Sequence, residues 1–194
     1  MSRYDASTAL VVVDVQNDFA DPEGGLFVAG GEAVVGAVNA EVVRALSSEA
    51  FVVYTQDWHP ESTPHFEKDG GVWPVHCVGG TWGAELHPRL LVAGPTVRKG
   101  TNGEDGYSGF TMRDPRTDSE VPTPLGAMLA SAGVSSVVVV GLALDVCVKA
   151  TALDSVARGH HTTVVRQASA AVDLAAGDGD RAVEEMVRSG VGVA

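Results

Sequence analysis

The chain has 194 residues, a formal net charge of −12 at pH 7 and a hydrophobic fraction of 45%. So acidic a protein is repelled by nucleic-acid phosphates and by anionic membrane surfaces, which excludes both as expected partners. Its length suits one globular domain over residues 1–194. No apolar run approaches the roughly 18 residues of a membrane span. With two cysteines and no secretory signal at the N-terminus, we expect a reducing, cytoplasmic location.

Strand-like and helix-like segments alternate along the chain. The first is the unbroken apolar run TALVVV, residues 8–13, which is typical of a strand buried on both faces. Apolar residues recur at helical spacing in the segment from Gly30 to Leu46, and FVVYTQ, residues 51–56, returns to the strand pattern. A long irregular segment, residues 57–90, is inserted after this second strand, and loops of such length inside a domain are usually functional.

The second half of the chain repeats the alternation. A short strand around Val97, in PTVRKG, precedes an irregular acidic stretch over residues 101–122. The remaining predicted elements are a helix over 124–132, a valine-rich strand from 137, a helix carrying Cys147, a strand over 161–165, a helix over 180–188 and the final GVGVA. Such alternation predicts right-handed crossovers and a mainly parallel sheet with helices on both faces, a three-layer α/β/α fold.

Chemically capable side chains follow four of the predicted strands. In sheets of this kind ligands bind at the carboxyl ends of the strands. The residues at or just past those ends are Asp14, then Asp57 with His59, then Lys99, and finally Cys147. We therefore expect a functional site at this edge of the sheet.

Cys147 is placed by its pattern in the first turn of a helix, just beyond the valine strand. Asp145 is a natural cap for that turn, and unpaired backbone N–H groups there favour a thiolate. We therefore expect a lowered pKa for the Cys147 thiol. A buried structural role, the commoner fate of a free cysteine, stays open on this stretch alone.

Asp14 and Lys99 suggest a catalytic role when they are considered together with Cys147. Asp14 directly follows three valines, where partial desolvation would raise its pKa and suit it to act as a general base. A lysine near both a carboxylate and a thiol would hold the one and help to ionise the other. A turn aspartate and a solvated lysine are the alternatives. If the three groups do lie together, a thiol beside a carboxylate and a lysine indicates nucleophilic acyl transfer.

Four metal-binding side chains are crowded between residues 57 and 76: Asp57, His59, His65 and His76. Two or three histidines with one carboxylate suit one divalent transition metal, and zinc, iron(II) and manganese all fit this set. Chance clustering in a loop is the alternative. The same ligands occur in the facial triad of non-haem iron oxygenases, but alternating strands and helices disfavour that class by analogy of fold.

The chain resembles the nicotinamidases within the isochorismatase-like cysteine hydrolases. The segments that carry the resemblance are VVVDVQNDF, DWHPESTPHF, WPVHCVGGTWGAELHP, VRKG, YSGF and VVGLALDVCVKATALDSV, which span nearly the whole chain in order. The resemblance implies an isochorismatase-like hydrolase fold and a catalytic trio that falls on Asp14, Lys99 and Cys147. It also places the metal ligands at Asp57, His59 and His76, with His65 matching a fourth ligand of some members.

The resemblance further implies how a substrate is held. A non-proline cis peptide between Leu142 and Ala143 would precede the nucleophile, and the backbone N–H groups of Ala143 and Cys147 would form an oxyanion hole. The substrate-binding positions fall on Phe19, Trp73, Tyr107 and Leu142. The sequence departs from the family pattern at two positions that bear on the substrate range: Leu144, where relatives usually have threonine, and Val146, where they often have histidine or tyrosine.

The implied activity is hydrolysis of nicotinamide to nicotinic acid and ammonia through a cysteine thioester, as in NAD salvage, with pyrazinamide as a further expected substrate. Another small-molecule amidase of the same superfamily is the nearest alternative. A non-catalytic metal-binding or thiol module is the alternative from a different class. The identity of the metal and the formation of a homo-oligomer stay open.

Overall fold

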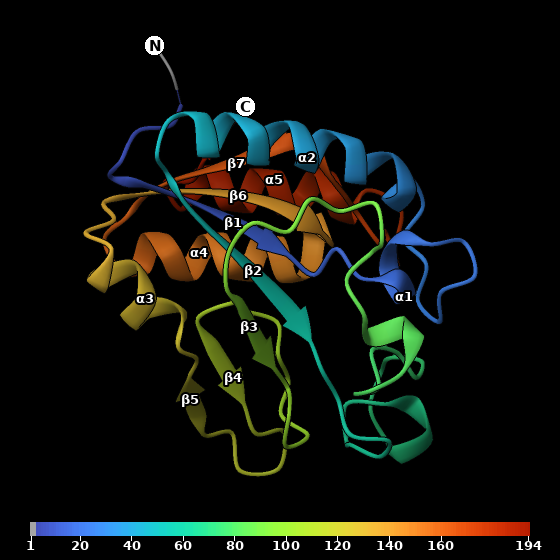
Figure 1. Cartoon of the computed structure of the whole chain (residues 1–194). Coiled ribbons are helices and arrows are strands. Elements are labelled where there is room, and N and C mark those ends of the chain that lie inside the picture. Colours follow the sequence, from blue (N-terminus) through green and yellow to red (C-terminus); the bar gives the residue numbers. More distant parts are fainter. Residues whose placement is uncertain (1–2) are drawn as a thin grey trace.

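The computed structural model describes residues 3–194 and contains a six-stranded, wholly parallel sheet (Figure 1). The strands lie in the order β3-β2-β1-β6-β7-β8. Their bounds are β1 Thr8–Val13, β2 Phe51–Asp57, β3 Thr96–Lys99, β6 Ser136–Leu142, β7 His161–Ala170 and β8 Gly192–Val193. The predicted parallel sheet is confirmed, and its order places the ends of β3, β2, β1 and β6 side by side.

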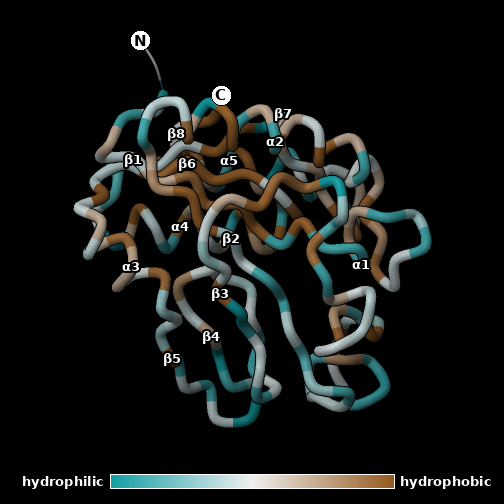
Figure 2. Tube along the Cα trace, viewed as in Figure 1, coloured by the Kyte–Doolittle hydropathy of each residue, from teal (hydrophilic) through white to brown (hydrophobic). Residues whose placement is uncertain are grey.

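Helices cover both faces of the sheet, as predicted. Helix α2 (Gly31–Ser47) covers one face, whereas α3 (Leu125–Ser131), α4 (Lys149–Ala157) and α5 (Asp178–Arg188) cover the other. Successive residues of β1 alternate between the two cores: Leu10 and Val12 pack on the α2 side, and Val11 and Val13 on the other. This double burial explains the unbroken apolar run, and Figure 2 shows the hydrophobic inner strands.

The connections between the strands contain short helices and strands that the sequence did not predict. A short antiparallel pair, β4 (Thr111–Arg113) and β5 (Glu120–Pro122), lies within the stretch predicted to be irregular. One helical turn, α1 (Asn17–Ala20), follows β1, and two 3₁₀ turns, η1 (Glu67–Asp69) and η2 (Trp82–Ala84), lie between β2 and β3. Across residues 3–194 no helix is both long enough and apolar enough to span a membrane.

The chain after β6 takes an unusual course. A cis peptide joins Leu142 to Ala143, and a π-helical turn, η3 (Leu144–Val148), leads into α4. Gly141 has a φ of +113°, and a Cβ there would lie 2.1 Å from the carbonyl oxygen of Val13, so only glycine fits. Asp145 does not cap its own helix, contrary to the prediction. Its carboxylate instead accepts hydrogen bonds from the backbone N–H groups of Val172 and Asp173, at 2.9 Å each.

Candidate active site

Asp14, Lys99 and Cys147 meet at the carboxyl edge of the sheet, although they come from the ends of three different segments. Asp14 directly follows β1, Lys99 ends β3, and Cys147 lies in η3. The Nζ atom of Lys99 lies 2.7 Å from Oδ2 of Asp14 and 3.7 Å from Sγ of Cys147. Thr55 of β2 donates a hydrogen bond of 2.7 Å to Oδ1 of Asp14. Strands β1, β2 and β3 and the turn η3 therefore bring together an acid, a cation and a thiol.

Burial controls the protonation of Asp14 and Cys147. It raises the pKa of Asp14 above 3.8, even though the Lys99 ammonium acts in the opposite direction. Burial also raises the pKa of the Cys147 thiol well above its usual value, again against Lys99, while the carboxylates of Asp14 and Asp57 raise it further. The expected lowering of the thiol pKa is therefore wrong. The thiol keeps its proton until a neighbouring base removes it.

The Lys99 ammonium also connects this trio to Asp57. Its Nζ atom lies 3.2 Å from Oδ1 of Asp57 and donates a further hydrogen bond to the carbonyl oxygen of Gly106. Burial alone would lower the pKa of Lys99, but the carboxylates of Asp14 and Asp57 outweigh it and raise the pKa well above 10.5. Burial would likewise raise the pKa of Asp57, but Lys99 and His59 hold it well below its usual range. Lys99 and Asp57 each favour the charged form of the other.

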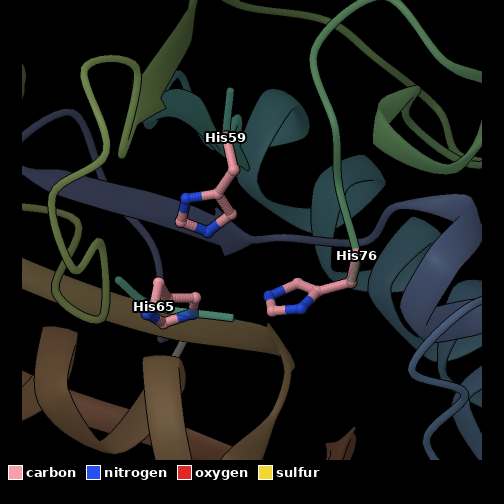
Figure 3. Close-up of side chains that lie close together, drawn as sticks. All are labelled: His59, His65 and His76. Atoms are coloured by element: carbon pink, nitrogen blue, oxygen red, sulfur yellow. The ribbon is translucent and has the colours of Figure 1, made fainter. Parts of the chain in front are cut away.

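The second oxygen of Asp57 faces a cluster of imidazole rings from the connection between β2 and β3. Oδ2 lies 3.2 Å from Nε2 of His59 and 3.5 Å from Nε2 of His76. Potential ligand atoms of His59, His65 and His76 all lie within 4.8 Å of one another, and the three rings surround a common space (Figure 3).

This cluster fits a divalent transition metal. Ligand atoms bound tetrahedrally to one zinc ion, each at about 2.0–2.2 Å, are about 3.3–3.6 Å apart, and the distances around Asp57 Oδ2 are of that size. Nδ1 of His76 donates a hydrogen bond of 2.7 Å to the carbonyl oxygen of Pro74, which leaves Nε2 for the shared space. Burial lowers the pKa of His65, and a neutral imidazole is the form that binds a metal. The donor set is therefore suited to such an ion.

A cavity opens beside Cys147 and the imidazole cluster. Several expected residues line it, namely Phe19, Trp73, Tyr107, Ala143 and Cys147. The indole Nε1 of Trp73 donates a hydrogen bond of 3.0 Å to the hydroxyl of Tyr107, so two of its aromatic walls are joined. Three aliphatic residues also line it, Leu26, Val146 and Val172, and so do three of the proposed metal ligands, Asp57, His65 and His76. The cavity thus combines mostly apolar walls with a thiol, a carboxylate and imidazoles.

Two residues close to Cys147 in the sequence lie outside this cavity. Leu142 was expected among the substrate-binding residues, but its side chain is fully buried in the core on the α2 side of the sheet. Leu144, one of the two departures from the family pattern, is also fully buried, in the core on the opposite side. Leu142 ends β6 and Leu144 begins η3, and both side chains pack into the interior rather than toward the cavity, although they are close to Cys147 in the sequence.

Two polar residues support the site but were not predicted from the sequence: Gln16, directly before α1, and Asp18, within it. The Gln16 amide donates to the carbonyl oxygen of Asp57 at 2.8 Å and accepts from the Asp57 N–H at 2.7 Å. The Asp18 carboxylate accepts from the N–H of Cys77 at 2.6 Å and from that of Gly25 at 2.8 Å. Both residues belong to the DVQNDF segment, but their partners are too distant in sequence for spacing to reveal them.

Comparison with known proteins gives a consistent family. The isochorismatase domain model matches residues 8–194. A nicotinamidase/pyrazinamidase of Mycobacterium tuberculosis is 40% identical over 174 residues, which cover 87% of this chain and 86% of that protein. A nicotinamidase of Acinetobacter baylyi is 36% identical over 204 residues, covering 94% of this chain and 90% of the relative.

Solved structures agree over nearly the full length. The PnC1 protein of L. infantum, in complex with nicotinate, superposes with a TM-score of 0.88 at 35% identity and covers 98% of this chain and 94% of its own. The pyrazinamidase of Pyrococcus horikoshii, in complex with zinc, gives a TM-score of 0.86 at 35% identity, covering 97% and 98%. Sequence, fold and coverage lead to one conclusion: the chain belongs to the isochorismatase domain family.

Proposed function

We propose that this protein is a nicotinamidase, an amidohydrolase that converts nicotinamide to nicotinic acid and ammonia through a thioester on Cys147. The observation that carries the proposal is the meeting of three groups at one edge of the sheet, with the Lys99 ammonium 2.7 Å from Asp14 and 3.7 Å from Cys147. Nicotinamidases and a nicotinate-bound structure are among its relatives over most of the chain, which supports the choice of substrate. The proposal extends to pyrazinamide.

In the first half of the reaction, Asp14 acts as the general base. Its carboxylate takes the proton from the Cys147 thiol, and the thiolate attacks the carboxamide carbon. The resulting oxyanion is stabilised by the backbone N–H groups of Ala143 and Cys147. Asp14 then gives its proton to the leaving nitrogen, the C–N bond breaks, and ammonia departs, leaving a thioester. The Lys99 ammonium keeps Asp14 ionised between steps and steadies the thiolate.

In the second half, water completes the cycle. Asp14 removes a proton from a water molecule, which attacks the thioester carbonyl carbon. Collapse of the second tetrahedral intermediate breaks the C–S bond, and the Cys147 sulfur regains its proton from Asp14. Nicotinic acid leaves, and both residues return to their starting states. Burial raises the pKa of Asp14, which makes its carboxylate a stronger base toward the thiol and toward water.

We assign the metal site to Asp57, His59, His76 and His65. A divalent ion held there would supply a fixed positive centre that binds the pyridine nitrogen, directly or through water. Zinc is our choice, because the P. horikoshii relative was crystallised with zinc and the donor set suits that ion.

The cavity walls orient the ring. Phe19 and Trp73 would flank the two faces of the pyridine, with Tyr107 as a further wall, so that the carboxamide is directed toward Cys147. We also place the enzyme in the cytoplasm, because both cysteines are free, as is usual in a reducing compartment.

Release of ammonia from nicotinamide tests the proposal. We expect release by the wild type, none above background by Cys147→Ala, and retained release by Cys77→Ala. Cys77 is the matched control because its buried side chain lies outside the cavity lining. Absence of release from the metal-loaded wild type would contradict the proposed activity, and unimpaired release by Cys147→Ala would contradict the role of that sulfur.

A further inference from the structure

Asp105 makes a direct contact with the imidazole cluster from outside it. Its Oδ1 atom lies 2.7 Å from Nδ1 of His65, and both side chains are buried. This bond fixes Nδ1 as the donor of the His65 ring, because the carboxylate can only accept. The remaining nitrogen, Nε2, is then the unprotonated one and is left for the space shared with His59 and His76.

The carboxylate of Asp105 is held rigidly in turn. Its backbone pairs with that of Arg113 in both directions, through hydrogen bonds of 2.7 and 3.0 Å. The Arg113 guanidinium also lies 3.0 Å from Oδ2, the oxygen that His65 does not use. Both oxygens of the Asp105 carboxylate are therefore engaged, Oδ1 by His65 and Oδ2 by Arg113.

A second connection fixes the position of the histidine loop. The Thr63 hydroxyl donates a hydrogen bond of 2.8 Å to the carbonyl oxygen of Gly103, two residues before Asp105. It also accepts a hydrogen bond of 3.3 Å from the His65 N–H. Two hydrogen bonds therefore join the loop of His65 to the loop of Asp105: one from the Thr63 hydroxyl to the Gly103 backbone, and one between the side chains of His65 and Asp105.

We propose that Asp105 is a positioning residue that holds His65 in the tautomer and orientation of a metal ligand, so that His65 is the fourth ligand of the ion. The inference rests on the metal site assigned under the proposed function. Carboxylates that accept from the second nitrogen of a ligating histidine fix its ring and raise its basicity, and their loss typically weakens metal binding by about 10- to 100-fold.

The affinity for zinc, measured by competition with a chromophoric chelator, tests this role without reference to catalysis. We expect Asp105→Ala to weaken binding by about 10- to 100-fold. Asp105→Asn should restore part of the loss, because its amide oxygen still accepts from Nδ1. The matched control is Asp118→Ala, which removes the outer, exposed partner of Arg113 and should leave zinc affinity unchanged.

A double-mutant cycle separates positioning from general support of the loop. His65→Ala should weaken zinc binding, and adding Asp105→Ala or Asp105→Asn to it should cause no further loss, because Asp105 acts through that ring. Equal losses with and without His65, or unchanged affinity in both single variants, would overturn the proposal. If Asp105→Ala does not fold, the asparagine variant carries the same cycle. None of these outcomes bears on ammonia release by the zinc-loaded wild type, which tests the activity separately.

Discussion

Lys99 is a single cation shared by two buried carboxylates. Its side chain is fully buried and lies within 3.2 Å of both Asp14 and Asp57. Removal of one partner from a buried ionic group is costly, because the remaining charges lose their compensation. The folded protein therefore depends on Lys99 for stability as well as for the proposed chemistry.

We expect Lys99→Met to lower the free energy of unfolding by about 3–5 kcal/mol, since the methionine fills similar volume but leaves two carboxylates unpaired. Denaturant unfolding of the metal-free proteins at pH 7 measures the effect. Lys149→Met is the control, because Lys149 pairs with Glu185 in a partly exposed position and such pairs contribute less than about 1 kcal/mol. Equal stability of Lys99→Met and wild type would show that the carboxylates do not need the cation.

The hydrogen bond from Thr55 tunes the proposed base. It lowers the pKa of Asp14, so Thr55→Val removes a lowering influence and should raise that pKa further. The base must be ionised, and kcat/KM therefore falls as pH drops through the Asp14 pKa. We expect the acid limb of the pH profile to begin above the range of an exposed aspartate and to move to higher pH in Thr55→Val. A displacement to lower pH would contradict the assignment of that limb to Asp14.

At the scale of residues, the sequence identified the reactive side chains at the strand ends but not their burial or their contacts with distant residues. Asp14, Lys99 and Cys147 were predicted from their positions at strand ends, and the structure brings them together. The predicted lowering of the thiol pKa was wrong because burial, which outweighs the effect of a helix start, depends on segments distant in sequence. Asp105 escaped prediction for a similar reason, since its partner His65 is 40 residues away.

Helix α4 fixes the loop that carries Tyr107. The Asp154 carboxylate accepts hydrogen bonds from the hydroxyls of Ser108 and Thr111, at 2.7 and 3.0 Å. Thr151, one turn earlier, accepts from the Gly109 N–H at 2.9 Å. A wall of the cavity is therefore held by the helix that begins just after the nucleophile.

We expect Asp154→Ala to raise KM for nicotinamide by about 5- to 30-fold with a smaller change in kcat, since lost hydrogen bonds of about 1–2 kcal/mol would loosen a binding wall rather than the reacting groups. Steady-state ammonia release gives both constants. Asp154→Asn, which keeps an acceptor oxygen, should lie nearer the wild type. A fall in kcat at constant KM would instead indicate that the loop acts on the chemical step.

The sequence predicted the regular elements well where burial imposes a clear period. The run TALVVV coincides with β1, and the helix expected from Gly30 corresponds to α2. The strand at HTTVV is correct but continues to Ala170, because the prediction followed the apolar run, which the polar residues Arg166 and Gln167 interrupt. The pair β4 and β5 could not be predicted, since three residues each are too few for a period to emerge.

At the scale of the molecule, the assigned metal site links one long connection to the rest of the fold. Asp57 ends β2, whereas the three histidines lie in the connection that follows. A ligand that binds only the folded state stabilises it by mass action. Loss of the ion should therefore be seen in unfolding as well as in activity.

We expect chelation to abolish ammonia release and to lower the melting temperature by about 8–16 °C relative to protein with free zinc at 1,000 times its Kd, where bound zinc contributes about 4 kcal/mol. Calorimetry with and without chelator measures the shift, and re-addition of zinc should restore both properties. The variant His76→Ala, which lacks one proposed ligand, should show a smaller shift. An unchanged melting temperature on chelation would argue against a metal bound to the native state.

The order of the strands divides the proposed chemistry between two halves of the chain. The base directly follows β1 and the shared cation ends β3, whereas the sulfur follows β6, beyond the exposed turn at residues 115–118. Cleavage in that turn would yield one fragment without a nucleophile and another without a base. Any ammonia released by a mixture of the two fragments would then come only from reassembled molecules. The junction between β1 and β6 is therefore a suitable place to divide the protein into a split reporter.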